Sequence, residues 1–169
     1  PIPRGQSTAA GGAHAMATLR QCLAYAQAGT VDGIVFAPLN KSSLHMAQMG
    51  HPDELHWFAE VLGHTGAHSE FNVLDGLWTC RVTSHVAIRE VADLITPEKV
   101  IGAVALIRDA LVAAGIERPR IAVCGLNPHN GDNGAFGREE IEIIGPALEE
   151  ARRRGLPCEG PFPADTIFL

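Results

Sequence analysis

The chain has 169 residues, 46% hydrophobic and 19% charged, which suits one folded domain over residues 1–169 and excludes a disordered chain. Its net charge of -6, with only 13 lysines and arginines, argues against nucleic acid as a partner. No apolar run approaches the roughly 18 residues of a membrane helix and the four cysteines are scattered, so we expect a cytoplasmic protein with reduced thiols and no membrane contact.

The first third of the chain predicts helices and one buried strand. Apolar residues at three- and four-residue spacings predict a helix over 13–28. The apolar run 34–36 predicts a buried strand that ends before Pro38. Asn40 is an expected cap of a short helix, and a further helix is expected to begin near Pro52.

The remaining chain alternates strand and helix patterns. The expected elements are a hairpin of strands 70–74 and 78–83, a helix from 97 to about 114, a buried strand over 121–124 and a helix over 138–153. Asp75-Gly76 favours the tight turn of the hairpin, and Thr96-Pro97 is a strong helix start. This alternation predicts an α/β fold with a mostly parallel sheet flanked by helices, in which ligands bind beyond the carboxyl ends of the strands.

Two of the eight histidines come shortly after expected strands. His85 comes after residues 80–83, and His129 comes after 121–124 in a turn fixed by Pro128. If both strands lie in one sheet and point the same way, both imidazoles project from one edge and can share a metal ion. Asp132 is then a candidate partner for His129. The alternative is that both are ordinary loop histidines, because no H-E-x-x-H spacing is present.

Three further features are candidate ligand sites. The glycine loop 131–137 lies between a strand and a helix, so its amides can face an anion, although a plain structural loop explains the pattern as well. Lys41 can meet a carboxylate or phosphate, or it can be a solvated lysine. His51 and Glu54 stand at a helix start, where they can bind the hydroxyls of a polar ligand or belong to a helix cap.

Five sequence blocks follow one another in a recognisable order. They are A-P-L-N-K at 37–41, T-S-H-V-A-I-R at 83–89, I-T-P-E at 95–98, N-P-H-N-G-D at 127–132 and P-A-D-T at 163–166. In this order they resemble the 4-hydroxythreonine-4-phosphate dehydrogenase (PdxA) family, from about residue 29 to the last residue. The resemblance implies a two-domain fold similar to the isocitrate and isopropylmalate dehydrogenases.

The resemblance also implies an activity. Members of the family are homodimeric, NAD-dependent dehydrogenases of pyridoxine biosynthesis, and they need a divalent metal such as zinc, cobalt, magnesium or manganese. They oxidise and decarboxylate a phosphorylated hydroxy acid such as 4-phosphohydroxy-threonine. The implied metal ligands are His85 and His129, and the third family histidine lies beyond residue 169. We therefore expect the chain to be the central portion of a longer enzyme and to be inactive alone.

The substrate-binding pattern departs from the family. The family's G-H-T-E matches Gly50 and His51, but Pro52-Asp53-Glu54 replaces the T-E pair. We expect His51, Lys41 and Glu54 to bind the substrate. The departure leaves open a related dehydrogenase for another hydroxy acid or for a cis-dihydrodiol carboxylate, because a site that hydrogen-bonds a hydroxyl discriminates strongly when its polar groups change.

Two alternative hypotheses assign the chain to other functional classes. The chain can be a non-catalytic α/β module for dimerisation or interaction, with His85 and His129 vestigial. It can also be a phosphate- or nucleotide-binding protein that uses the glycine loop 131–137, although no P-loop lysine follows that loop.

Overall fold

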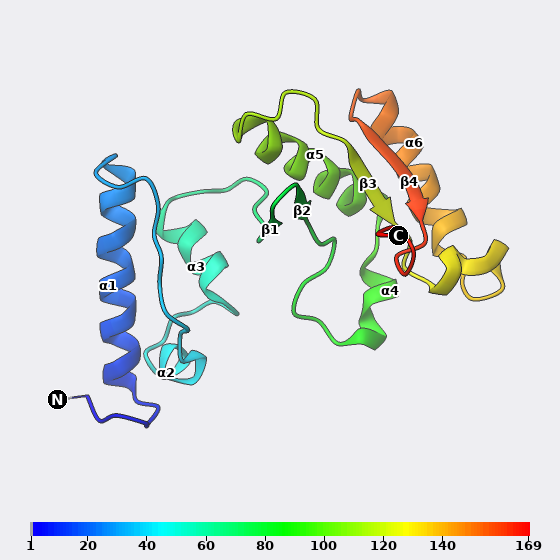
Figure 1. Cartoon of the computed structure of the whole chain (residues 1–169). Helices are drawn as coiled ribbons and strands as arrows, with labels where there is room; N and C mark the ends of the chain where they lie inside the picture. Colours follow the sequence, from blue (N-terminus) through cyan, green and yellow to red (C-terminus); the bar gives the residue numbers. More distant parts are fainter. Residues whose placement is uncertain (1) are drawn as a thin grey trace. The chain divides into compact units, whose positions relative to one another are not determined.

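The computed structural model describes residues 2–169, which form two compact units, one up to Gly66 and one from Ala67 to Leu169 (Figure 1). Each unit has its own cluster of buried apolar side chains. This division does not test whether residues 1–169 fold as one domain, so that expectation stays a prediction. Within the described part of the chain, no helix has the length and apolar character needed to cross a membrane.

The first unit consists of three helices that begin with side-chain caps. They are α1 (Ala9–Gln27), α2 (Lys41–Met46) and α3 (Glu54–Val61). The side chains of Thr8, Asn40 and Asp53 each accept a backbone N–H from the first turn of the helix that follows, which satisfies a donor that the helix cannot pair internally. The expected helix starts at Asn40 and near Pro52 are therefore confirmed. The core of the unit is formed by Leu19, Leu23, Leu44, Met49 and Trp57.

The strand expected over 34–36 is wrong. No strand is assigned there, and Val35 and Phe36 are exposed. A strand forms only where a neighbouring strand pairs with its N–H and C=O groups. Among residues 2–169, the strands pair only with one another in the second unit. The apolar pattern of residues 34–36 predicts a strand, but no neighbouring strand pairs with this segment.

The strands of the second unit form two separate pairs. Strands β1 (Asn72–Leu74) and β2 (Leu77–Thr79) form an antiparallel hairpin, which confirms the turn predicted at Asp75-Gly76 with shorter strands than expected. Strands β3 (Ile121–Cys124) and β4 (Cys158–Phe162) pair in parallel. Strand β4 is not among the expected elements, because Gly160 and Pro161 interrupt its apolar pattern.

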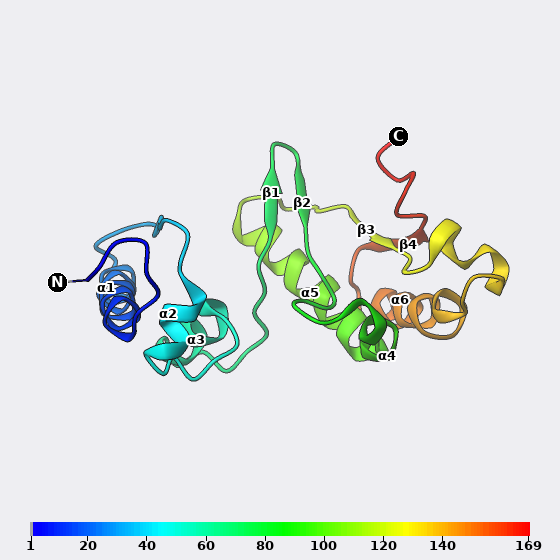
Figure 2. The same ribbon diagram turned by 90° about the horizontal axis from the view of Figure 1, so that it is seen from below.

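Two helices cover the parallel pair. Helices α5 (Pro97–Ala113) and α6 (Gly145–Arg153) lie on the same side of β3 and β4 (Figure 2). Their buried side chains pack with Ile121 of β3 and Cys158 of β4. The parallel pair and its covering helices confirm the expected α/β class.

Shorter helical segments complete the second unit. They are η1 (Ile88–Glu90), α4 (Val91–Leu94), η2 (Pro128–Gly134) and the π-helix η3 (Glu140–Ile144). The helix predicted over 138–153 is thus present, but its first turns are a π-helix that continues into α6. Pro146 accounts for the change, because it lacks the N–H that a regular helix would donate to Glu142.

Gly12 generates a prediction for the first unit. A Cβ atom on Gly12 would overlap the Ser43 backbone carbonyl and lie 2.9 Å from the Ala47 Cβ, so helices α1 and α2 meet without room for a methyl group. We expect Gly12→Ala to lower the free energy of unfolding by about 1–3 kcal/mol. Chemical denaturation followed by circular dichroism measures this change.

Gly102→Ala is the matched control. Gly102 lies within α5, and a Cβ there would meet no atom within 4 Å. Alanine should therefore raise the free energy of unfolding by about 0.5–1 kcal/mol, through its better helix propensity. Equal effects of the two substitutions would contradict the close approach of α1 and α2.

Candidate functional site

The chain leaves β3 through a loop with an unusual backbone. Five consecutive residues, 129–133, have positive φ values between 43° and 78°. His129 is one of them, with φ of 53°. Left-handed backbone costs a residue other than glycine about 1 kcal/mol or more. Contacts elsewhere in the fold must therefore hold the loop in this shape.

The carboxylate of Glu140 provides the main contact to the start of this loop. Its Oε1 atom accepts the backbone N–H groups of Leu126 and Asn127, each at 2.7 Å. Its Oε2 atom accepts the Asn127 side-chain amide at 3.0 Å. The same amide donates to Oε2 of Glu139 at 2.6 Å. Glu140 is only 4% exposed, so a buried carboxylate organises the segment that leads to His129.

Three glycines give this carboxylate its space. A Cβ on Gly125 would lie 2.3 Å from Oδ1 of Asn130, and one on Gly131 would lie 2.8 Å from Oε2 of Glu140. A Cβ on Gly137 would lie 2.3 Å from the Asn127 side-chain nitrogen. The glycines thus allow close approach within the protein. This geometry favours the structural interpretation of the loop, since the anion held at its start is the protein's own.

The pKa of the Glu140 carboxyl reflects these contacts. Burial acts to raise this pKa, but the hydrogen bonds from the Asn127 side chain and from the amides of Asn127 and Leu126 outweigh it and leave the pKa lowered from 4.5. Because hydrogen bonds to a carboxylate favour its charged form, Glu140 is ionised at neutral pH. The buried group is therefore a charged acceptor.

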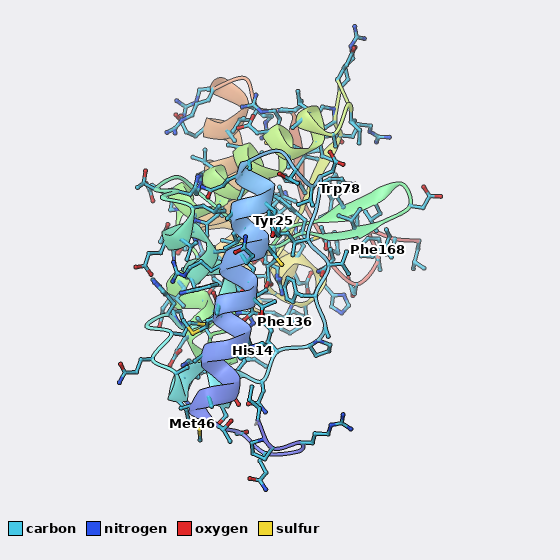
Figure 3. The ribbon with its side chains drawn as sticks, turned by 90° about the vertical axis from the view of Figure 1, so that its left-hand side faces the viewer. His14, Tyr25, Met46, Trp78, Phe136 and Phe168 are labelled. Carbon is cyan, nitrogen blue, oxygen red and sulfur yellow. The ribbon has the colours of Figure 1, made fainter. Side chains whose placement is uncertain are left out.

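His129 itself faces outward. Its side chain is 71% exposed, and Nδ1 lies 3.5 Å from Oδ2 of Asp165. The ring is tilted against Phe136, which is labelled in Figure 3, with the ring centroids 6.4 Å apart. Asp132 was the expected partner of His129, but Asp165 occupies that position. The P-A-D-T block at 163–166, which contains Asp165, was the available signal.

His85 lies in a different setting from the expected one. It follows β2, has a φ of 55°, and its Nδ1 lies 3.1 Å from the Ser84 hydroxyl. The expectation that the strands before His85 and His129 belong to one sheet is wrong, because β2 pairs antiparallel with β1 and β3 pairs with β4. The tight turn at Asp75-Gly76 pairs β2 with β1, and β3 pairs with β4 instead.

A cavity nevertheless connects the two histidine segments. It has a volume of about 220 Å³ and is lined both by residues 81–83, which lead to His85, and by residues 123–126, which lead to His129. Its other walls come from α4, α5 and η3. Within residues 2–169, no three His, Cys, Asp or Glu side chains cluster as a metal site. Metal binding by His85 and His129 stays a prediction.

The expected substrate residues lie in the first unit. Lys41, the first residue of α2, places its Nζ 3.7 Å from Oε2 of Glu54, the first residue of α3. That oxygen is buried and has no hydrogen-bond partner. His51 pairs with Glu60 through its Nε2 atom. The structure thus brings Lys41 and Glu54 together and gives His51 a carboxylate partner of its own, while their role towards a substrate stays a prediction.

Comparisons with known proteins agree on one family. The profile of the family described as pyridoxal phosphate biosynthetic protein PdxA matches residues 2–169. A Pseudomonas aeruginosa protein with the provisional name 4-hydroxythreonine-4-phosphate dehydrogenase 2 is 59% identical over 168 residues, which cover 99% of this chain and 50% of that protein. The D-threonate 4-phosphate dehydrogenase of Salmonella typhimurium is 36% identical, with 99% of this chain and 51% of that protein covered.

A solved structure shows the same fold. The crystal structure of 4-hydroxythreonine-4-phosphate dehydrogenase from Klebsiella pneumoniae matches with a TM-score of 0.89 and 34% identity, over 99% of this chain and 50% of that one. The chain thus spans about half the length of the curated relatives and of the solved structure that it matches.

The lowered pKa of Glu140 predicts how stability depends on pH. Because the folded protein binds the Glu140 proton less tightly than the unfolded chain does, this group stabilises the fold above about pH 4.5, and the stabilisation is lost as the pH falls through the lowered folded pKa. Glu140→Gln should remove this part of the pH dependence. Urea denaturation between pH 3 and 7 measures it, and an unchanged profile in the variant would contradict the assignment.

Proposed function

Because the chain belongs to the PdxA family, we propose that it forms part of an NAD-dependent, metal-requiring dehydrogenase that oxidises and then decarboxylates a phosphorylated hydroxy acid. The names of the relatives suggest 4-phosphohydroxy-threonine or D-threonate 4-phosphate as the substrate. The observation that carries the proposal is the loop after β3, where a buried carboxylate organises the backbone and His129 remains exposed at its tip.

The donor chemistry around His129 fits a divalent metal. An exposed imidazole whose Nδ1 lies 3.5 Å from a carboxylate has the partner that metal-ligating histidines usually have, and its other nitrogen suits zinc, cobalt or manganese. We propose His85 and His129 as two of the ligands, because each follows a segment that lines the 220 Å³ cavity. A bound divalent metal would polarise the substrate hydroxyl and stabilise negative charge beside it.

The protein residues would have separate tasks in this reaction. Asp165 would accept the Nδ1–H of His129 and so fix the tautomer that leaves Nε2 as the ligand atom. Lys41 is half-exposed and lies beside Glu54, where its ammonium group would attract the phosphate or carboxylate of the substrate. His51 would accept a hydrogen bond from a substrate hydroxyl at Nδ1, while Glu60 accepts its Nε2–H and orients the ring.

Self-association and location remain part of the proposal. The β1–β2 hairpin exposes Val73, Leu74 and Leu77, and apolar side chains gathered on an exposed hairpin are typical of a surface that another chain covers. We propose a homodimer in the cytoplasm. Sedimentation velocity tests the first point, and a monomer at high concentration would contradict it.

His129→Ala tests the metal-binding proposal. Two imidazoles alone should hold Co²⁺ weakly, and removal of one of them should lower the affinity at least tenfold, because metal affinity depends on each ligand nitrogen. Titration of the visible Co²⁺ absorption measures this loss. His14→Ala is the matched control, since His14 is an exposed histidine of α1. Equal Co²⁺ affinity in the wild type and in His129→Ala would refute the ligand assignment.

Lys41→Met tests the substrate proposal. The loss of the ammonium group should raise KM for a phosphorylated hydroxy acid about tenfold or more and change kcat less, because an ion pair to the phosphate forms before the reaction. Steady-state NADH formation by the native enzyme with added divalent metal measures both constants. We expect no turnover from the 169-residue chain alone. Turnover only with a cis-dihydrodiol carboxylate would favour the alternative substrate class.

A further inference from the structure

The second unit contains a buried carboxylate, that of Glu140, to which the proposed function assigns no role. We propose that Glu140 is a positioning residue, whose carboxylate holds the loop 127–133 at the end of β3 and so sets where His129 presents its imidazole. The inference rests on the proposed function, because it assigns a purpose to the position of His129. It concerns a residue that touches neither the proposed metal nor the substrate.

The contacts of the carboxylate point to the loop rather than to a ligand. Both of its oxygens accept hydrogen bonds, Oε1 from two main-chain amides and Oε2 from the side chain of Asn127. With 4% of its surface exposed, the group has no free face for a metal or substrate. The carboxylate therefore binds Leu126 and Asn127, the two residues that precede Pro128.

The loop is anchored at a second point. The side-chain amide of Asn130 donates to the carbonyl oxygen of Pro161 at 3.2 Å. This contact ties the residue after His129 to β4, while Glu140 ties Asn127 to the start of the helical segment. His129 thus lies between two fixed points. Its own side chain remains 71% exposed, which is the arrangement expected of a ligand whose backbone is held by other groups.

The backbone conformation explains why such anchoring is needed. His129, Asn130, Asp132 and Asn133 all have positive φ values, a conformation that residues with a Cβ adopt only under constraint. The glycines at 125, 131 and 137 provide room for the Glu140 and Asn127 side chains. Without the carboxylate, the amides of Leu126 and Asn127 would lose their acceptor, and the loop would relax towards ordinary backbone angles.

The neighbouring acidic residues provide a matched control. Glu142 lies on the same helical segment but is exposed and pairs with Arg138. Glu140→Gln keeps the size of the side chain and removes its charge, and it turns one acceptor oxygen into a donor that faces the Asn127 amide. Glu142→Gln makes the same chemical change at a carboxylate that pairs with Arg138 instead of with the loop amides. A difference between the two variants therefore reports the contact with the loop.

The experiment measures Co²⁺ affinity and amide hydrogen exchange of the full chain, at a temperature where circular dichroism shows every variant to be folded. We expect Glu140→Gln to weaken Co²⁺ binding about tenfold or more, to alter the visible Co²⁺ spectrum, and to speed exchange of the Leu126 and Asn127 amides. Glu142→Gln should match the wild type in all three measurements. A merely structural role would lower the melting temperature of Glu140→Gln and leave the Co²⁺ affinity of the folded protein unchanged.

The possible failures are distinguishable. If His129→Ala weakens Co²⁺ binding but Glu140→Gln does not, the positioning role is wrong and the proposed function stands. If the wild type shows no binding that depends on His129, the metal site fails and the positioning role fails with it. If Glu140→Gln cannot be purified in a folded state, Asn127→Ala removes only the side-chain donor to the carboxylates, and unchanged Co²⁺ affinity in that variant overturns the inference.

Discussion

The contact between the Glu140 carboxylate and the backbone amides of Leu126 and Asn127 determines the geometry at the end of β3. A buried carboxylate is stable only when it is hydrogen-bonded, and buried amides need an acceptor. Each side of this contact therefore satisfies the requirement of the other. The left-handed loop after Asn127 and the close approaches that Gly125, Gly131 and Gly137 allow both surround this contact.

In this arrangement, one residue positions the loop from the interior, and another residue of the loop faces solvent. Glu140 is buried and fully hydrogen-bonded, whereas His129 is exposed with Asp165 beside Nδ1. The first unit has a related division at the start of α3. Asp53 is buried and caps the helix, while the next residue, Glu54, keeps a buried oxygen beside Lys41 without a hydrogen bond. In both places a buried, hydrogen-bonded carboxylate lies near a group that the proposed function assigns to a ligand.

Local sequence patterns did not predict which apolar segments form strands or which strands pair. Residues 34–36 and 121–124 are both short apolar runs, yet only the second is a strand, because β4 provides its partner. The strand before His85 is paired by its own hairpin, so the histidine segments are brought together by the walls of a cavity rather than by one sheet edge. An apolar run indicates burial or pairing in general, but the identity of the pairing strand depends on the whole chain.

The sequence by itself determined the features that depend on neighbouring residues. The caps at Asn40 and Thr96, the turn at Asp75-Gly76 and the ordered family blocks were all readable, because capping, turn conformation and motif spacing involve residues a few positions apart. Only the tertiary structure decided that Glu140 accepts the amide of Leu126, 14 residues earlier. It likewise paired β4 with β3 and brought Asp165 to His129. These contacts join residues far apart in the sequence, so their formation depends on how the helices and strands pack, and no local pattern encodes that packing.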